Sequence, residues 1–204
     1  MNIIVLNSAP GGGKDTIASY IVNHVTGAYK AEVKALLFDL AIRMSGLNRE
    51  TWFALYNDRR FKESPCPYLI VAGKQVSLRE YLIHISEHVM KPLFGNDFFG
   101  KQSAQRLANL FEGNETIVFS DGGFIEEVKE LSELAYSTNG HFFLVRIHRG
   151  DDDWKNDSRG WLHLSENNIR GVSFDVTNEE GKMEECAEEI IAKVSRVMAE
   201  EEED

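Results

Sequence analysis

The stretch that most constrains the fold is residues 2–26, in which an apolar run, a glycine-rich turn, a lysine and an apolar helix follow one another. The run Asn2-Ile-Ile-Val-Leu-Asn7 has the composition of a buried strand, because β-branched residues pack well on a pleated surface. After the turn, Ile17, Ile21 and Val25 recur at helical spacing and indicate a helix with one apolar face. This order of elements is typical of a phosphate-binding loop.

Three features of the turn converge on an anion. Gly11, Gly12 and Gly13 lack a Cβ, so the backbone can adopt positive φ angles and direct N–H groups toward a phosphate. The ammonium of Lys14 can reach the outer phosphates of a nucleotide, and a helix that starts near Asp15 presents its positive end to the same place. We therefore assign Gly11 to Thr16 to nucleotide binding.

The loop departs from the pattern G-x-x-x-x-G-K-[ST] at two positions. Ser8 stands at the first glycine, and Asp15 stands at the Mg²⁺-binding hydroxyl, with Thr16 one residue later. A Gly-Lys-x-Thr ending resembles the loop of nucleoside monophosphate kinases, in which the hydroxyl follows the lysine by two residues. We therefore interpret Thr16 as the hydroxyl near the metal, directly or through water.

Length and composition are those of a globular protein. The chain has 204 residues, of which 43% are hydrophobic and 27% charged, as expected for one domain with a covering segment. No apolar run approaches the roughly 20 residues of a membrane span, and no signal peptide precedes the first strand, so we expect a cytoplasmic protein without a membrane partner. Cys66 and Cys186 form no C-x-x-C pair, and we expect both to be reduced.

The formal net charge of −11 is concentrated at one end of the chain. Residues 179–204 contain eleven acidic and three basic residues, a net charge of −8. We interpret the acidic tail at 199–204 as a solvated, frayed terminus. Such a tail repels nucleic acid, so the charge gives no support to a general DNA-binding role.

Apolar runs alternate with amphipathic stretches along the rest of the chain. Strands are expected over 29–31, 116–121, 140–147 and 172–176, and helices over 33–44, 51–56, 77–90, 97–111, 124–136 and 183–197. We expect Met44 and Leu110 to lie on the buried faces of their helices. The alternation predicts an α/β fold in three layers, with a parallel sheet, helices on both faces and ligands at the carboxyl ends of the strands.

The irregular region from about 48 to 100 is interpreted as an acceptor segment that covers the site. Ser77 is expected to cap a helix, with Glu80 at the reciprocal capping-box position. The same helix contains His84-Ile-Ser-Glu87-His88, which fits the zinc-hydrolase pattern H-x-x-E-H. We disfavour zinc hydrolysis because no distal ligand is evident and the phosphate loop already assigns the chemistry.

Two later segments add charged groups to the predicted site. The run Thr116-Ile-Val-Phe-Ser120-Asp121 ends in a carboxylate. Because the end of this strand is expected to lie beside the phosphate loop, we expect Asp121 to bind the coordination shell of Mg²⁺. The polar, glycine-flanked segment 149–160 has the composition of a mobile lid. Its Arg149 and Arg159 suit the charge that spreads over a transferring phosphoryl group.

The pattern as a whole resembles the phage-type deoxynucleoside monophosphate kinases, a branch of the P-loop kinases. The resemblance rests on Gly13-Lys14-Asp15-Thr16, Lys34, Arg79 with Glu87, Asp121 with Phe124 and Glu127, Arg149, His163 with Ser165-Glu166, and Asn178. It implies ATP and Mg²⁺ as cofactors and an Asn178 loop near the ATP base. It also implies a nucleotide substrate bound by Lys34, Arg79, Glu87, Phe124 and Glu127.

One departure from that family concerns the acceptor. The family usually has x-Arg-aromatic after the strand-end Asp, whereas here Gly122 and Gly123 precede Phe124. Either Arg149 or Arg159 compensates for the missing arginine, or the acceptor differs. Related phage kinases are thought to phosphorylate a hydroxymethylated pyrimidine within DNA, and a glycine-lined floor suits a bulkier acceptor.

Three hypotheses follow from the sequence. In the first, ATP phosphorylates a deoxynucleoside monophosphate to the diphosphate, with Lys14, Asp121, Arg149 and Arg159 as catalytic residues and Thr16 and Asp121 at the metal. In the second, the acceptor is a modified base in DNA, and nucleic acid is a partner. The third is a nucleotide-binding regulatory module that contacts a partner through its acidic tail. A homodimer is compatible with each.

Overall fold

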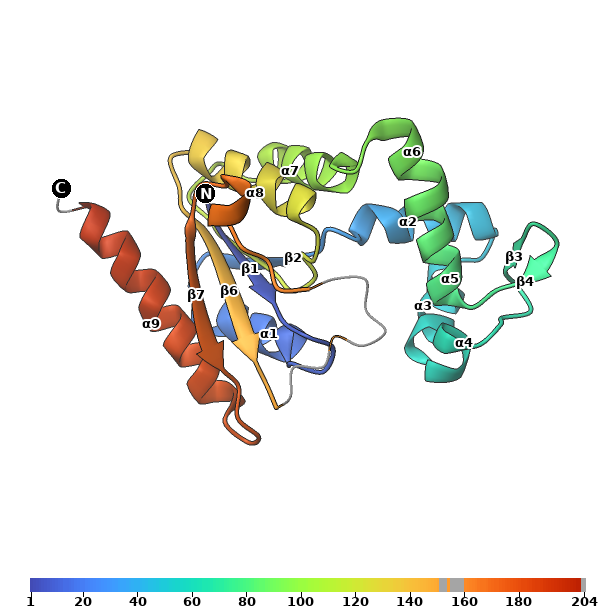
Figure 1. The fold of residues 1–204 in the computed structure, drawn as a ribbon, viewed down its shortest axis with the longest axis horizontal. Coiled ribbons are helices and arrows are strands. Elements are labelled where there is room, and N and C mark those ends of the chain that lie inside the picture. The colour runs from blue at the N-terminus through green and yellow to red at the C-terminus, as the bar shows by residue number, and fades with distance from the viewer. Residues whose placement is uncertain (151–153, 155–159, 203–204) are drawn as a thin grey trace. The chain divides into compact units, whose positions relative to one another are not determined.

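The computed structural model describes residues 1–150, 154 and 160–202, and its chain divides into two compact units. Unit 1 comprises Met1–Val33 and Gly100–Asp204, and unit 2 comprises Lys34–Phe99. The predicted acceptor segment, about 48–100, falls almost wholly within unit 2, which begins earlier than the sequence suggested. Figure 1 shows the elements of both units in chain order.

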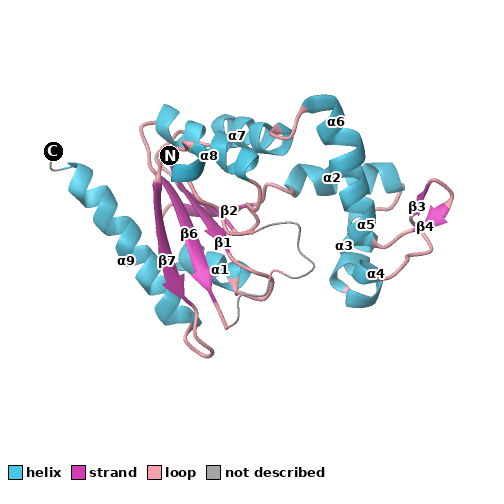
Figure 2. Ribbon diagram, viewed as in Figure 1, coloured by secondary structure: helices cyan, strands magenta, loops and turns pink. Residues whose placement is uncertain are grey.

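Unit 1 contains a sheet of five parallel strands in the order β2-β5-β1-β6-β7. Figure 2 draws the strands in magenta. The strands are β1 (Asn2–Asn7), β2 (Ala28–Ala31), β5 (Thr116–Phe119), β6 (Phe142–His148) and β7 (Val172–Thr177). In register, Ile4 of the central strand β1 lies between Val118 of β5 and Phe143 of β6. The predicted α/β fold with a parallel sheet is confirmed.

Helices cover both faces of this sheet, which explains why its central strands are apolar on both sides. On one face, α1 (Lys14–His24) and α9 (Met183–Glu202) pack against each other and share a buried cluster with alternate residues of β1, β6 and β7. On the other face, α8 (Ile125–Ser137) contacts β1 and β6. Helix α7 (Phe98–Leu110) closely approaches α8, since a Cβ at Gly100 would lie 2.7 Å from the Cα of Glu127.

Unit 2 is built mainly of short helices around its own core. Its elements are α2 (Ala35–Ser45), α3 (Arg49–Asn57), α4 (Arg59–Glu63), β3 (Ile70–Val71), β4 (Lys74–Gln75), α5 (Leu78–Ile83), η1 (His84–Met90) and α6 (Lys91–Phe94). Trp52, Cys66, Leu78 and Ile85 are fully buried in this core. The β3–β4 hairpin was not predicted, because its two-residue strands are too short to produce an alternating pattern.

The helix predicted over residues 77–90 begins as expected and then changes type. Ser77 and Glu80 form the predicted capping box, with Oγ of Ser77 accepting from the backbone N–H of Glu80 at 3.1 Å. From His84 to Met90, however, the backbone is a π-helix. Pro92 follows it, and a proline ring in a regular α-helix clashes with the carbonyl of residue i−4, here His88. The wider π turn is one way to relieve that clash.

Two apolar stripes were predicted wrongly at one position each. Met44 of α2 is 54% exposed and Leu110 of α7 is 63% exposed, whereas Phe38 and Leu107 on the same helices are buried.

Helix α9 extends to Glu202, so most of the tail predicted to fray is helical. Within the described ranges, none of the helices combines the length and the apolar character that a membrane span requires.

Candidate functional site

The glycine-rich turn joins the end of β1 to the start of α1, as the sequence predicted. Gly11 and Gly13 have φ angles of 85° and 89°, a left-handed conformation that residues with a Cβ adopt only under strain. Gly13 occupies the N-cap position of α1 and has no side chain with which to accept from the first turn. The positive end of this helix is therefore not capped by its own N-cap residue, which suits an anion.

Ser8 and Gly12 are in close contact across the turn. A Cβ at Gly12 would lie 2.2 Å from Oγ of Ser8, so the serine side chain occupies the space that any larger residue at position 12 needs. Ser8 is 2% exposed, and its hydroxyl donates to the carbonyl of Ala9 at 3.0 Å. The replacement of the first glycine of the motif by serine is thus accommodated by a glycine four residues later.

The ammonium of Lys14 lies against the inner side of the turn. Its Nζ donates to the carbonyl of Ser8 at 2.8 Å, to Oγ of Ser8 at 3.0 Å and to the carbonyl of Ala9 at 3.3 Å. An ammonium group beside a helix N-terminus adds to the positive potential of the turn. The turn therefore concentrates positive charge on one spot.

Two residues from the ends of β6 and β7 hold the turn in place. The side-chain amide of Asn178, which is 2% exposed, donates to the carbonyl of Gly12 at 2.9 Å. The guanidinium of Arg149 donates to the carbonyl of Gly11 at 3.3 Å. The backbone N–H of Asn178 donates to the carbonyl of His148 at 2.8 Å, which joins the ends of the two strands. Arg149 and Asn178, predicted as site residues, therefore both contact the turn.

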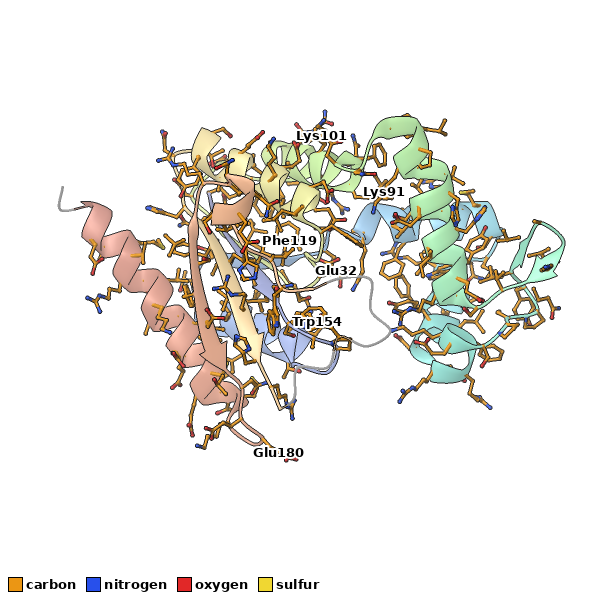
Figure 3. The ribbon with its side chains drawn as sticks, viewed as in Figure 1. Glu32, Lys91, Lys101, Phe119, Trp154 and Glu180 are labelled. Carbon is orange, nitrogen blue, oxygen red and sulfur yellow. The ribbon has the colours of Figure 1, made fainter. Side chains whose placement is uncertain are left out.

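The far end of the predicted lid segment is anchored to β1. The side-chain amide of Asn7 donates to the carbonyl of Gly160 at 3.2 Å, and its oxygen accepts from the N–H of Leu162 at 3.1 Å. The predicted lid at 149–160, with Arg159, lies largely outside the described residues, of which only Arg149, Gly150, Trp154 and Gly160 belong to it. The side chain of Trp154, labelled in Figure 3, packs edge-on against Trp161, with the ring centroids 5.2 Å apart.

Oxygen-bearing side chains gather where β5 ends beside α1. Oδ1 of Asp15 accepts from the hydroxyl of Ser120 at 2.7 Å and from Nζ of Lys30 at 3.0 Å. Oδ1 of Asp121 accepts from the N–H of Val33 at 3.0 Å. Thr16, predicted to lie near the metal, is exposed on the first turn of α1. Asp15, which stands at the hydroxyl position of the motif, is the residue that reaches the end of β5.

This donor set fits Mg²⁺, which prefers hard oxygen ligands and retains several waters. Asp15 and Asp121 supply carboxylates, and Thr16 and Ser120 supply hydroxyls, all at the carboxyl edge of the sheet or on the first turn of α1. Oxygens of this kind suit a metal bound to phosphate better than they suit a nitrogen- or sulfur-ligated metal.

A charged cluster at the ends of β6 and β7 was missed by sequence reasoning. The guanidinium of Arg146 makes two hydrogen bonds to Asp175, at 3.0 and 2.7 Å, and Nε2 of His148 lies 2.7 Å from the same carboxylate. Hydrogen bonds from Arg146, helped by His148, hold the pKa of Asp175 well below its usual range, against the effect of burial. The sequence signal that could have predicted this cluster is the presence of polar residues at every second position near the ends of otherwise apolar strands.

The predicted acceptor residues are distributed over both units. In unit 2, Nζ of Lys34 lies 5.8 Å from the ring centroid of Phe38, and Nη1 of Arg79 lies 3.7 Å from a carboxylate oxygen of Glu63. Oε1 of Glu87 accepts from Nζ of Lys91 at 2.6 Å. In unit 1, Phe124 is the N-cap residue of α8, and Glu127 is 6% exposed in the first turn of that helix.

Hollows and groups of metal-binding side chains outside the phosphate turn are two further kinds of candidate site. A hollow of about 360 Å³ on α7 is lined by Gln102, Gln105, Arg106, Asn109 and Leu110, none of which is a predicted site residue. Within the part of the chain that the structure describes, no group of three or more His, Cys, Asp or Glu side chains could hold a metal ion. The H-x-x-E-H segment therefore has no third ligand among these residues, and the zinc-hydrolase interpretation has no support.

Comparisons with known proteins give little further guidance. No protein-family model matches the chain, and no curated protein matches its sequence. Among solved structures, the chain is similar to the tunicamycin resistance protein of Deinococcus radiodurans, with 15% sequence identity and a TM-score of 0.45 over 95% of each chain. That likeness is too low to carry an argument, so the functional case rests on the geometry described above.

Proposed function

We propose that the protein is an ATP-dependent phosphotransferase that phosphorylates a deoxynucleoside monophosphate to the diphosphate. The observation that carries this proposal is the convergence of Lys14, the glycine turn and the N-terminus of α1 at the end of β1, beside the acidic end of β5. A site of this kind binds phosphate by charge and by backbone N–H groups, and it places oxygen ligands next to the bound group.

The residues of the turn act on the phosphates of ATP. Lys14 exchanges its contacts with Ser8 and Ala9 for oxygens of the outer phosphates, and the first-turn amides of α1 bind the same anion. Asn178 and Arg149 keep the turn in shape by binding its carbonyl groups. Because phosphoryl transfer asks little covalent chemistry of the protein, positioning and charge stabilisation account for most of the catalysis.

Bound Mg²⁺ neutralises charge on the phosphate oxygens. Asp15, Thr16 and Asp121 would hold it, either directly or through water. Arg149 and Arg159 are proposed to stabilise the charge that develops on the transferring group, as the composition of their segment suggests. A phosphate acceptor is already a good nucleophile, so no strong general base is required of the protein.

The acceptor is assigned through the family resemblance. That resemblance implies Lys34, Arg79, Glu87, Phe124 and Glu127 as the residues that bind the monophosphate. Glu127 is nearly buried at the start of α8, where a carboxylate is favoured by the positive end of the helix.

A second candidate is transfer to a hydroxymethylated pyrimidine in DNA. It is favoured by Gly123, which stands where the resembled family has an arginine. The distribution of charge also permits it: unit 2 contains nine Lys and Arg residues against seven Asp and Glu, whereas unit 1 contains thirteen against twenty-six. The acidity of the chain therefore does not extend to the unit that contains most of the predicted acceptor residues.

One experiment separates these functions from a nucleotide-binding regulatory module. Purified protein is incubated with γ-labelled ATP and each deoxynucleoside monophosphate, and in parallel with plain and hydroxymethylated DNA. Transfer to a free monophosphate supports the first function, and transfer only to the DNA supports the second. Tight ATP binding with no transfer to either contradicts both and leaves the regulatory module.

A further inference from the structure

Two histidines lie side by side on the π-helix of unit 2 and take no part in the proposed transfer. His84 and His88 are four residues apart on η1, and their ring centroids are separated by 5.4 Å with the ring planes inclined at 50°. A π-helix of seven residues is rare, and such turns often occur at functional sites. The position of the pair on such a turn makes it a candidate ligand site.

The ring separation matches a shared metal ion. Two imidazole nitrogens bound to one Zn²⁺ at about 2.0–2.1 Å place their ring centroids about 5–6 Å apart. The rings are tilted rather than stacked, an arrangement that is compatible with a nitrogen of each ring binding a common ion. No change of backbone is needed to bring the two side chains together.

Both imidazoles are available to a ligand. His84 is half-buried and His88 is exposed, and within the described ranges neither makes a hydrogen bond or an ion pair. The nearby carboxylate of Glu87 is already bound, since its Oε1 accepts from Oγ of Ser86 at 2.9 Å and from Nζ of Lys91 at 2.6 Å. The partners of the Glu87 carboxylate are therefore Ser86 and Lys91 rather than the two imidazoles, whose ring nitrogens can bind a cation.

We propose that His84 and His88 form a chelating site for a divalent transition-metal ion on the surface of unit 2. Imidazole nitrogens suit Zn²⁺, Ni²⁺ and Cu²⁺ and discriminate against Mg²⁺, which prefers oxygen. With two protein ligands, the remaining coordination positions are taken by water or by an oxygen of another molecule. This site is distinct from the phosphate turn and does not depend on the proposed transfer reaction.

The test uses the full chain without a histidine tag. Binding of Ni²⁺ and Cu²⁺ is measured by titration calorimetry for the unaltered protein and for the variants His84→Ala, His88→Ala and His24→Ala. His24 is a matched control because it is exposed but has no histidine beside it on α1. Its ring stacks on that of Tyr20, with the ring centroids 3.9 Å apart. Circular dichroism checks that each variant keeps its helices.

We expect one Ni²⁺ per chain at this site, and a loss of affinity of about tenfold or more in either site variant but not in His24→Ala. The electron paramagnetic resonance spectrum of bound Cu²⁺ should show hyperfine coupling to two nitrogens, and to one nitrogen in each site variant. Equal affinity in all four proteins, or a spectrum unchanged by His88→Ala, would overturn the proposal.

Discussion

The side-chain amide of Asn178 donates a 2.9 Å hydrogen bond to the carbonyl of Gly12, across 166 positions of sequence. This contact joins the end of β7 to the middle of the glycine turn. A Cβ at Gly13 would lie 2.6 Å from the same amide nitrogen, so the glycine is also what lets Asn178 approach. The shape of the turn thus depends on the last strand of the sheet as well as on its own glycines.

The first prediction concerns this hydrogen bond. Asn178→Ala removes the donor and leaves a buried carbonyl unsatisfied, so we expect a loss of about 1–3 kcal/mol in the free energy of unfolding and weaker ATP binding. Urea denaturation and nucleotide titration measure both effects. The control is Asn167→Ala, which removes an exposed amide that also donates to a backbone carbonyl, that of His163. A control that loses as much stability as Asn178→Ala would refute the prediction.

The second prediction concerns the contact between Ser8 and Gly12. Gly12→Ala should destabilise the turn by about 1–3 kcal/mol, because the new Cβ would overlap the serine side chain. In a Ser8→Gly background the same substitution should cost less, since the clashing hydroxyl is gone. A double-mutant cycle of unfolding free energies measures the coupling. Additive effects would mean that Gly12 is required for some other reason.

The third prediction concerns pH. The pKa of Asp175 is lowered in the folded protein by the hydrogen bonds from Arg146 and His148. Its stabilising effect is therefore complete above the pKa of an unfolded aspartate, about 3.9, and is lost as the pH falls below it. Asp175→Asn should destabilise the protein at pH 6, and the gap to the unaltered protein should narrow at pH 3. Urea denaturation at the two pH values tests this, and a constant gap would contradict it.

The fourth prediction concerns Lys30, whose ammonium lies 3.0 Å from Oδ1 of Asp15. If Asp15 holds the metal, this ammonium competes with it. Lys30→Met should then tighten the binding of Mn²⁺ with ATP by about two- to fivefold, a modest effect because the pair is partly exposed. Lys182→Met, which breaks a surface pair with Glu179, is the control. Unchanged Mn²⁺ affinity in Lys30→Met would argue against a metal at Asp15.

The strand and helix pattern of unit 1 was predictable because its residues obey local rules. The apolar run before Asn7 reads as a strand buried on both faces, and the glycines at 11 and 13 mark positions of positive φ. The capping box of Ser77 and Glu80 was likewise visible in four residues of sequence. Each of these features depends on neighbours within a few positions.

The features of the structure that could not be predicted from the sequence depend mainly on contacts between residues far apart in the chain. That Asp15 rather than Thr16 contacts the end of β5 is visible only in its hydrogen bond with Ser120, 105 positions away. The cluster of Arg146, His148 and Asp175 exists only because β6 and β7 are paired in one register. The π-helix from His84 to Met90 lies just before Pro92, and periodicity alone does not reveal this change of helix type.

The central claim is that the glycine turn and Lys14 bind the phosphates of ATP and transfer one of them. The most direct measurement is the transfer of γ-labelled phosphate to deoxynucleoside monophosphates by the unaltered protein and by Lys14→Met, with thermal unfolding to check the fold. We predict transfer by the unaltered protein, none above background by Lys14→Met, and unfolding transitions that remain cooperative in both. Turnover retained by a folded Lys14→Met protein would contradict the account.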